Sequence, residues 1–226
     1  MMLKKFLCGL TLFLTAMLYA ESYSCFFAPG KWDKSDWFII KSARWDHVGS
    51  WVQQSDHITN HVPPGLNEEE RKRSHKSYAA MMLKKKFDIA KTVTITSEMS
   101  FDHRMAPLIV FAPDHAKSPA GVPEFREHWE IVLYDLGINV WHHTFKDGKP
   151  YHVKAAYLLA PFKKHTRYRL ICRISDTRKG RMLEVECDGK RFGCHLASLT
   201  GKDIFAGIIG CEGINRFYDF NINNNK

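Results

Sequence analysis

Cysteine is scarce in this chain and follows no recognisable motif. Cys8 lies near the start, and five further cysteines contain no CxxC pair: Cys25, Cys172, Cys187, Cys194 and Cys211. This pattern excludes a cysteine zinc site and a small scaffold built on disulfides. Because five is an odd number, at least one of these thiols stays free or pairs between chains. The sequence assigns no disulfide connectivity.

Several functional motifs are also missing. The chain has no P-loop, no glycine-rich dinucleotide fingerprint, no serine nucleophile elbow and no internal repeat. It has no nucleic-acid-binding motif, so no nucleic-acid partner is expected. His57 and His61 have the spacing of helical metal ligands, but the β-branched residues between them do not favour a helix. No metal site is therefore predicted.

The first twenty residues have the layout of a secretory signal peptide. Lys4 and Lys5 precede an uncharged apolar stretch from Phe6 to Leu18, and Ala20 ends a plausible cleavage site. The stretch is shorter than the ~20 residues of a membrane span, and no later stretch is apolar enough for one. We expect residues 1–20 to be removed and residues 21–226 to form one domain. The protein is then secreted or periplasmic; an uncleaved anchor is the alternative.

Basic residues outnumber acidic ones. The chain has 33 Lys and Arg against 24 Asp and Glu, a formal charge of +9. Loss of Lys4 and Lys5 leaves 31 basic residues against the same 24 acidic ones, or +7. Such a charge favours anionic glycans, cell-wall polymers or lipid head groups as partners, or simply gives a solvated basic surface.

Short strands separated by turn signals dominate the chain after Phe87. The segment Thr92–Thr96 alternates strictly between apolar and polar residues, as a half-buried strand does. Further strands are expected at residues 107–112, 129–133, 138–143, 168–174, 183–187, 190–194, 204–209 and 216–222. One short helix is expected after Asn67, a good N-cap residue. Many short strands and little helix predict an all-β sandwich or barrel.

Asp188-Gly189 is a strong signal for a hairpin with a type I′ turn. The turn pairs Cys187 with Lys190, Val185 with Phe192 and Leu183 with Cys194. Cys187 and Cys194 then share the core face but lie far apart along it. No disulfide between these two cysteines is expected.

A second hairpin joins strands at 129–135 and 138–143. A tight Leu136-Gly137 turn is expected, which pairs Glu130 with His143 and Val132 with Trp141. Leu136 suits positive φ poorly, so a bulged three-residue turn is a competing interpretation. One face of the hairpin is typical of a core. The opposite face mixes polar and aromatic side chains: Glu130, Val132, Tyr134, Asn139, Trp141 and His143.

That mixed face has the chemistry of a sugar site. An aromatic ring stacks on the apolar face of a pyranose, while a few placed polar groups take its hydroxyls. The competing interpretation is a solvent face with an ordinary cross-strand aromatic pair. The candidate ligand-binding residues are Glu130, Tyr134, Asn139, Trp141, His143 and Arg104.

Three segments resemble a known family. Leu108-Ile109-Val110-Phe111, the strand His128–Tyr134 (HWEIVLY) and the closing segment Gly213–Ile222 are similar to concanavalin A-like lectin/glucanase domains, laminin-G-like domains included. The resemblance covers about Phe87 to Ile222. It implies a two-sheet antiparallel jelly-roll sandwich with a carbohydrate site on its concave sheet. A carbohydrate or polysaccharide partner is therefore expected, with an anionic polymer favoured by the charge.

The resemblance does not extend to the glucanase chemistry. Those enzymes carry an acidic-x-acidic-x-x-acidic motif, and a retaining pair needs carboxylates about 5–5.5 Å apart. Here Val132 and Tyr134 follow Glu130 on its face. The leading hypothesis is a glycan-binding module without catalysis. No cofactor is expected. The sequence does not decide whether a structural calcium ion is bound.

Two other functions stay open. One is a polysaccharide-degrading enzyme. As a hydrolase it would use Glu130; as a lyase it would use His143 or Tyr134 as the base, and Asn139 or Arg104 to neutralise a uronate carboxylate. The other is a structural or adhesive envelope protein. No catalytic residue is assigned.

Overall fold

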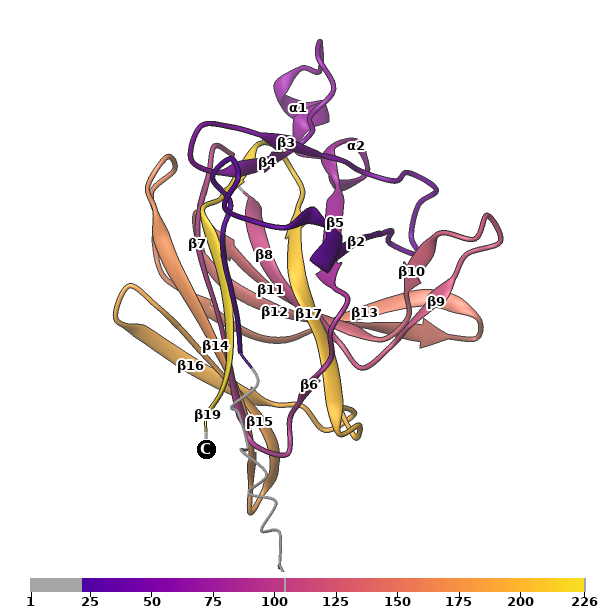
Figure 1. Ribbon diagram of the computed structural model, residues 1–226, viewed down its shortest axis with the longest axis vertical. Coiled ribbons are helices and arrows are strands. Elements are labelled where there is room, and N and C mark those ends of the chain that lie inside the picture. Colours follow the sequence, from indigo (N-terminus) through magenta and orange to yellow (C-terminus); the bar gives the residue numbers. More distant parts are fainter. Residues whose placement is uncertain (1–21, 104, 226) are drawn as a thin grey trace, which may run out of the picture.

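Two antiparallel sheets pack face to face in the computed structural model (Figure 1). It describes residues 22–103 and 105–225, so the expected signal peptide and Arg104 lie outside the described residues. No helix of the described part of the chain is long and apolar enough to cross a membrane.

The first sheet has nine strands. Its main path runs β16 (Lys190–His195), β15 (Gly180–Cys187), β14 (Tyr168–Thr177), β7 (Thr92–Phe101), β18 (Asn215–Phe217), β4 (Ile58–Asn60) and β3 (Trp51–Gln53). β19 (Asp219–Asn225) also pairs with β7, and β1 (Ser22–Phe26) pairs with β19.

The second sheet has eight strands. Its path runs β13 (Lys149–Leu159), β12 (Gly137–Lys146), β11 (His128–Tyr134), β8 (Met105–Ala112), β17 (Asp203–Gly210), β5 (Ala79–Leu83) and β2 (Trp37–Ile40), and β6 (Phe87–Asp88) pairs with β17. A separate hairpin of β9 (His115–Lys117) and β10 (Pro123–Phe125) projects at the right of Figure 1.

Helix within residues 22–103 and 105–225 is confined to three single turns: a 3-10 turn at Lys34–Asp36, α1 (Glu68–Arg71) and α2 (Ser74–Ser77). The predicted N-cap of α1 is confirmed. The Asn67 side chain accepts from the backbone N–H of Glu70, and the Glu70 side chain accepts from the N–H of Asn67. This reciprocal capping box satisfies two donors that a helix start leaves unpaired.

The main core lies between the two sheets. Alternate residues of each strand point inward, as the pleat requires, so Val93 and Ile95 on β7 face Ile131 and Leu133 on β11 across one buried cluster. Burial of such side chains stabilises a fold by roughly 1.5–3 kcal/mol each. The core therefore determines which face of each strand points outward and is left for solvent or a ligand.

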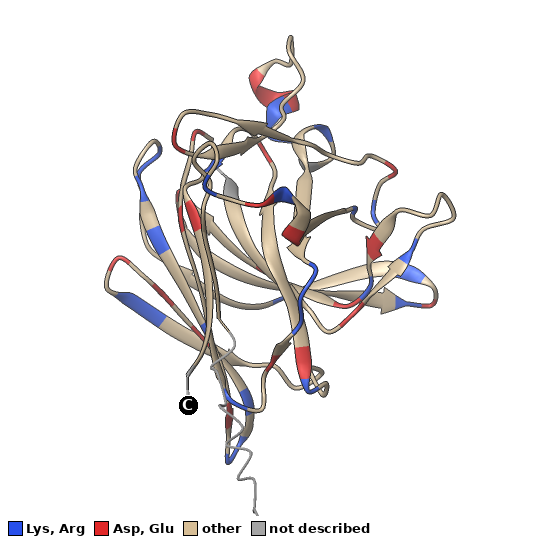
Figure 2. Ribbon diagram, in the orientation of Figure 1, with Lys and Arg blue, Asp and Glu red and all other residues tan. Residues whose placement is uncertain are grey.

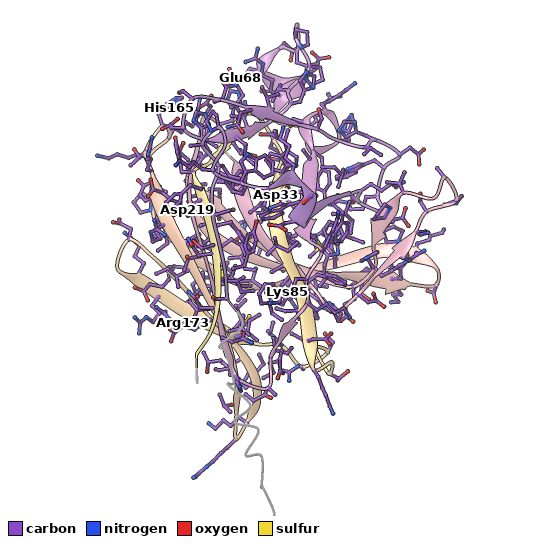
Figure 3. The ribbon with its side chains drawn as sticks, viewed as in Figure 1. Asp33, Glu68, Lys85, His165, Arg173 and Asp219 are labelled. Atoms are coloured by element: carbon purple, nitrogen blue, oxygen red, sulfur yellow. The ribbon has the colours of Figure 1, made fainter. Side chains whose placement is uncertain are left out.

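The outer face of the first sheet carries a network of paired charges. Figure 2 shows charged residues gathered on the outer hairpins and loops, while the central strands β8 and β17 are almost free of them. Arg173 pairs with Glu184 and Glu186, and Arg169 pairs with Asp219. Arg173 and Asp219 are labelled in Figure 3. These charges pair with one another across neighbouring strands.

The outer face of the second sheet carries a second apolar cluster. It includes Val110, Val132 and Tyr134 from the sheet, covered by Phe125 of β10. The segment after β2 is tied to β10, because the N–H of Lys41 donates to Pro123 and the N–H of Phe125 donates to Lys41. This face is therefore partly covered.

The hairpin predicted at Asp188-Gly189 is confirmed in register. Cys187 pairs with Lys190, and Leu183 pairs with Cys194. Asp188 and Gly189 both have positive φ, at 50° and 72°, as a type I′ turn requires. Cys187 and Cys194 are both free thiols, so they are not bonded to each other, as predicted.

The register predicted for the second hairpin is wrong by two residues. Glu130 pairs with Trp141, and Tyr134 pairs with Gly137, so the turn is Asp135-Leu136. Gly137 is needed inside β12 instead: a Cβ there would lie 2.0 Å from the carbonyl oxygen of Leu158 on β13. A two-residue shift preserves the faces, because side chains alternate with period two. The predicted division into core and outer face therefore stands.

Four strands after residue 62 were not expected, and one was predicted too long. The unexpected strands are β5, β9, β10 and β13, and the strand expected at 216–222 breaks at Tyr218 into β18 and β19. Arg216 pairs with Ser100 while Asn221 pairs with Thr96, so Tyr218 is the extra residue of a bulge.

Candidate functional site

Three neighbouring strands place polar residues in rows across the outer face of the second sheet. His128, His143 and His152 lie directly opposite one another on β11, β12 and β13. The next row on the same face is Glu130, Trp141 and Lys154. These rows follow from the pleat, which sends every second residue of each strand to this face.

Glu130 lies between two imidazoles. Its Oε1 is 3.3 Å from Nε2 of His128, and its Oε2 is 3.2 Å from Nε2 of His143. The His128 and His143 rings are stacked, with centroids 4.5 Å apart, and Phe125 stacks on the other side of His128 at 4.2 Å. Both histidines are buried. The packing therefore holds this His-Glu-His cluster in a defined position.

The two imidazoles set the charge of Glu130. Burial alone would raise its pKa, but His143 and His128 outweigh burial and hold the pKa below its usual range. Burial lowers the pKa of His128. At neutral pH the centre of the cluster is an ionised carboxylate.

A hollow of about 190 Å³ opens beside the cluster, and we call it the sheet hollow. Its lining is Arg44, Leu108, Glu130, Val132, Trp141, His143, His152, Cys211 and Glu212. Aromatic, apolar, cationic and acidic side chains therefore converge on one concave surface, where the apolar groups can hold a ligand and the few polar groups can orient it.

Arg44 is the exposed cation of this hollow. Its guanidinium lies over the Trp45 ring at 4.5 Å, and no carboxylate of residues 22–103 and 105–225 forms an ion pair with it. Lys154 is a second exposed cation, with its Nζ 5.3 Å from the centroid of the Trp141 ring. A ligand stacking on that face of Trp141 has to displace the Lys154 ammonium or pair with it.

Tyr78 supplies a buried hydroxyl near the cluster. The hydroxyl has no hydrogen-bond partner within the described part of the chain. Burial raises the pKa of Tyr78 well above its usual value, and the charge of Glu130 adds to the effect. An unpaired buried hydroxyl costs free energy, on the order of 1–3 kcal/mol.

The structure brings together only part of the predicted site. Glu130, Trp141 and His143 all line the sheet hollow. Tyr134 and Asn139 share their face but are buried, at 9% and 6% exposure, and do not line it. Their assignment as ligand contacts, and that of Arg104, stays a prediction.

Sequence reasoning missed several residues of this region, of which three are instructive. His128 carries a readable signal, because it alternates with Glu130 on one strand. His152 carries no such signal, because the local pattern does not show β13 to be a strand. Arg44 reaches the hollow from an irregular segment, and no local pattern reports such a long-range contact.

A larger hollow of about 280 Å³ lies at the edge of the sandwich, and we call it the edge hollow. Trp32, Trp37 and Trp51 line it, together with Lys34 and Gln53. The Trp32 indole N–H already donates to the Gln53 side chain at 2.9 Å. The edge hollow is aromatic but lacks the carboxylate and imidazoles of the sheet hollow.

Comparison with known proteins identifies the fold. No protein-family model matches the sequence, and no curated protein sequence matches it. Solved structures do match. The carbohydrate recognition domain of Emp46p in its potassium-bound form has a TM-score of 0.60 and 14% identity, over 88% of this chain and 95% of that one.

Two further structures are of the same kind. The winged bean acidic lectin complexed with methyl-α-D-galactose has a TM-score of 0.58 and 8% identity, over 90% of this chain and 98% of the lectin. The carbohydrate-binding module CBM66 from Bacillus subtilis has a TM-score of 0.52 and 8% identity, over 81% of this chain and 92% of the module. The predicted concanavalin A-like jelly roll is thereby confirmed.

Proposed function

We propose that this protein binds carbohydrate in the sheet hollow and prefers acidic sugars. The observation that carries the proposal is the meeting of Trp141, Arg44 and Glu130 on one concave surface. An indole face suits a sugar ring, and a carboxylate accepts hydrogen bonds from sugar hydroxyls. The carbohydrate-binding modules and lectins among the similar folds support this class of ligand.

The preference for acidic sugars rests on charge. Glu130 is already paired with two histidines, whereas Arg44 is exposed at the hollow and Lys154 is exposed over the Trp141 ring. A guanidinium binds a carboxylate or sulfate in a planar, bidentate manner. We therefore expect uronate-containing or sulfated polysaccharides to bind more tightly than neutral ones.

A second candidate function is a polysaccharide lyase. Arg44 and His143 line the same hollow, which places a cation that can neutralise a uronate carboxylate beside an imidazole that can act as base. Glu212 also lines the hollow and supplies a second carboxylate, as a hydrolase would require. Binding and product release therefore have to be measured together.

The test is a panel of neutral, uronate-containing and sulfated polysaccharides, with binding and products measured on the purified protein. Trp141→Ala is the site variant, and Trp32→Ala in the edge hollow is its matched control. We expect Trp141→Ala to weaken binding at least about 30-fold, the scale of a 2 kcal/mol hot spot. Loss of binding in Trp32→Ala alone would move the site to the edge hollow.

The products separate the two candidates. Binding without products supports a binding module. Unsaturated uronate ends support the lyase, and new reducing ends without unsaturation support a hydrolase. Absence of binding to every polymer would overturn the carbohydrate proposal and favour an envelope role. Export to the cell surface or periplasm stays a prediction from residues 1–20.

A further inference from the structure

We propose that His128, Glu130 and His143 bind a divalent transition metal ion of the zinc class. One ligand atom of each residue lies within 4.8 Å of the other two. The three residues come from adjacent strands of one sheet, which the two cores hold in position. Binding of the metal does not depend on the proposed carbohydrate function.

The donor set selects the class of metal. Two imidazole nitrogens and one carboxylate are the ligands of zinc, cobalt, nickel and iron(II) sites. Calcium and magnesium take oxygen ligands almost exclusively. This cluster therefore does not suit the structural calcium ion that the sequence left open.

The distances favour a shared ion. A charge-assisted hydrogen bond between an imidazole and a carboxylate is about 2.7–2.9 Å long. The two contacts of Glu130 are longer, at 3.3 Å and 3.2 Å. Ligands about 2.0–2.1 Å from a tetrahedral ion lie roughly 3.3 Å from each other. Each contact, made to a different carboxylate oxygen of Glu130, has about the spacing of two neighbouring metal ligands, and one ligand atom from each of the three residues lies within 4.8 Å of the others.

A backbone contact prepares His128 for this role. Its Nδ1 lies 3.4 Å from the carbonyl oxygen of Arg126. A ligating histidine usually donates its second ring N–H to such a carbonyl, which leaves the Nε2 lone pair for the metal. The same contact orients the His128 Nε2 toward Glu130.

Metal binding has a structural consequence. Because the His128 and His143 rings are stacked, their lone pairs converge on one ion only after one imidazole rotates about its Cβ–Cγ bond. Glu130 and His143 also line the sheet hollow, so a remaining coordination position faces Trp141 and Arg44. If the proposed function holds, a sugar oxygen can occupy that position.

The experiment is a titration of the chelator-treated, purified protein with cobalt(II) and zinc(II) chloride. Calorimetry gives the stoichiometry and affinity, and the visible spectrum of cobalt reports the coordination geometry. We expect one ion per chain and the intense ligand-field bands of a four- or five-coordinate site. Glu130→Gln and His143→Ala are the site variants, and His195→Ala, which removes an exposed histidine of β16, is the matched control.

We expect each site variant to lose more than about 100-fold in metal affinity. Loss of a residue that only hydrogen-bonds to a metal ligand already costs about 10–100-fold. His195→Ala should bind as the parent does. Near-ultraviolet circular dichroism checks that each variant is folded, and Glu130→Gln keeps the shape of the side chain in case His143→Ala does not fold. Equal affinity in the parent and a folded Glu130→Gln or His143→Ala, or no binding by the parent, would overturn the proposal.

Metal and sugar are measured separately. Cobalt binding with no polysaccharide binding would leave the metal inference standing and sink the proposed function. Polysaccharide binding by the chelator-treated protein with no cobalt binding would leave the proposed function standing and overturn the metal inference.

Discussion

Asn60, the last residue of β4, accepts a hydrogen bond from the backbone N–H of Asn215, the first residue of β18, at 2.9 Å. Its side-chain nitrogen donates to the carbonyls of Ser77 and Gly213 at 2.7 Å and 2.8 Å. Asn60 is 1% exposed. One buried amide therefore joins three segments that are remote in sequence, and β18 depends on it for its position.

Asn60→Ala should be strongly destabilising. It leaves one buried N–H and two buried carbonyls without their partner, and each such group costs about 1–3 kcal/mol. We expect a loss of about 4 kcal/mol in the free energy of unfolding, measured by urea denaturation. Asn221→Ala, which removes an exposed bond to Ser24, is the control and should change stability by less than about 1 kcal/mol. Equal effects would contradict this account.

Gly137→Ala should also destabilise the fold. The added methyl would meet the Leu158 carbonyl oxygen at 2.0 Å, so β13 would have to move away from β12. We expect a cost of about 3 kcal/mol or more. Gly148→Ala is matched to it, because Gly148 has φ of 73° in the turn between the same two strands and no atom within 4 Å of an added Cβ. It should cost only about 1 kcal/mol. A stable Gly137→Ala protein would show that the two strands are not held this closely.

Arg44 should determine the preference for acidic sugars. Arg44→Ala is expected to weaken binding of a uronate polymer about tenfold, or 1.4 kcal/mol, and to leave neutral sugars unaffected. Arg44→Lys keeps the charge but loses bidentate geometry, so it should restore binding only in part. Because the guanidinium is exposed, the difference should shrink as salt rises and the Debye length falls below about 8 Å. Equal losses for neutral and acidic sugars would contradict this role.

The thiols should react slowly in the folded protein. Burial raises the pKa of Cys194 to about 11 and that of Cys187 to about 12. The thiolate is the reactive form, and a free thiol ionises near pH 8.5. We expect slow reaction with a thiol reagent at pH 8. Unfolding a protein expressed from residue 21 should release all five thiols. A count of three or one would reveal disulfides.

The same thiols should make stability depend on pH. Below pH 8.5 they are protonated in both states and their burial costs nothing extra. As pH rises from about 8.5 toward 11, the unfolded chain ionises while Cys194 does not, so the folded state loses stability. Urea midpoints at pH 8, 9 and 10 measure this loss. Cys194→Ala should reduce the slope of stability against pH. An unchanged slope would contradict the role of Cys194 in this loss.

The sequence predicted the faces of the strands better than their partners. Alternation placed Glu130, Trp141 and His143 on one face, and the face survived an error of two residues in register. The register itself depended on Gly137, whose role is set by contact with β13, a strand that local pattern did not reveal. The fold class followed from many short strands, each readable on its own.

The site was harder to predict than the fold because its residues come from separate parts of the chain. His128 was readable from its alternation with Glu130. Arg44 and Tyr78 precede that strand by many residues, and only the packing of the segment after β2 over the second sheet brings Arg44 to the hollow.

The rows of the outer face are carried by β11, β12 and β13, which form one uninterrupted meander from residue 128 to residue 159. Its first turn is tied to the following segment, because the N–H groups of Ala160 and Phe162 donate to the carbonyls of Leu136 and Asp135. Its second turn has room, since a Cβ added at Gly148 would meet no atom within 4 Å. A change of length in the second turn can therefore alter this end of the hairpin while the sandwich core keeps its composition.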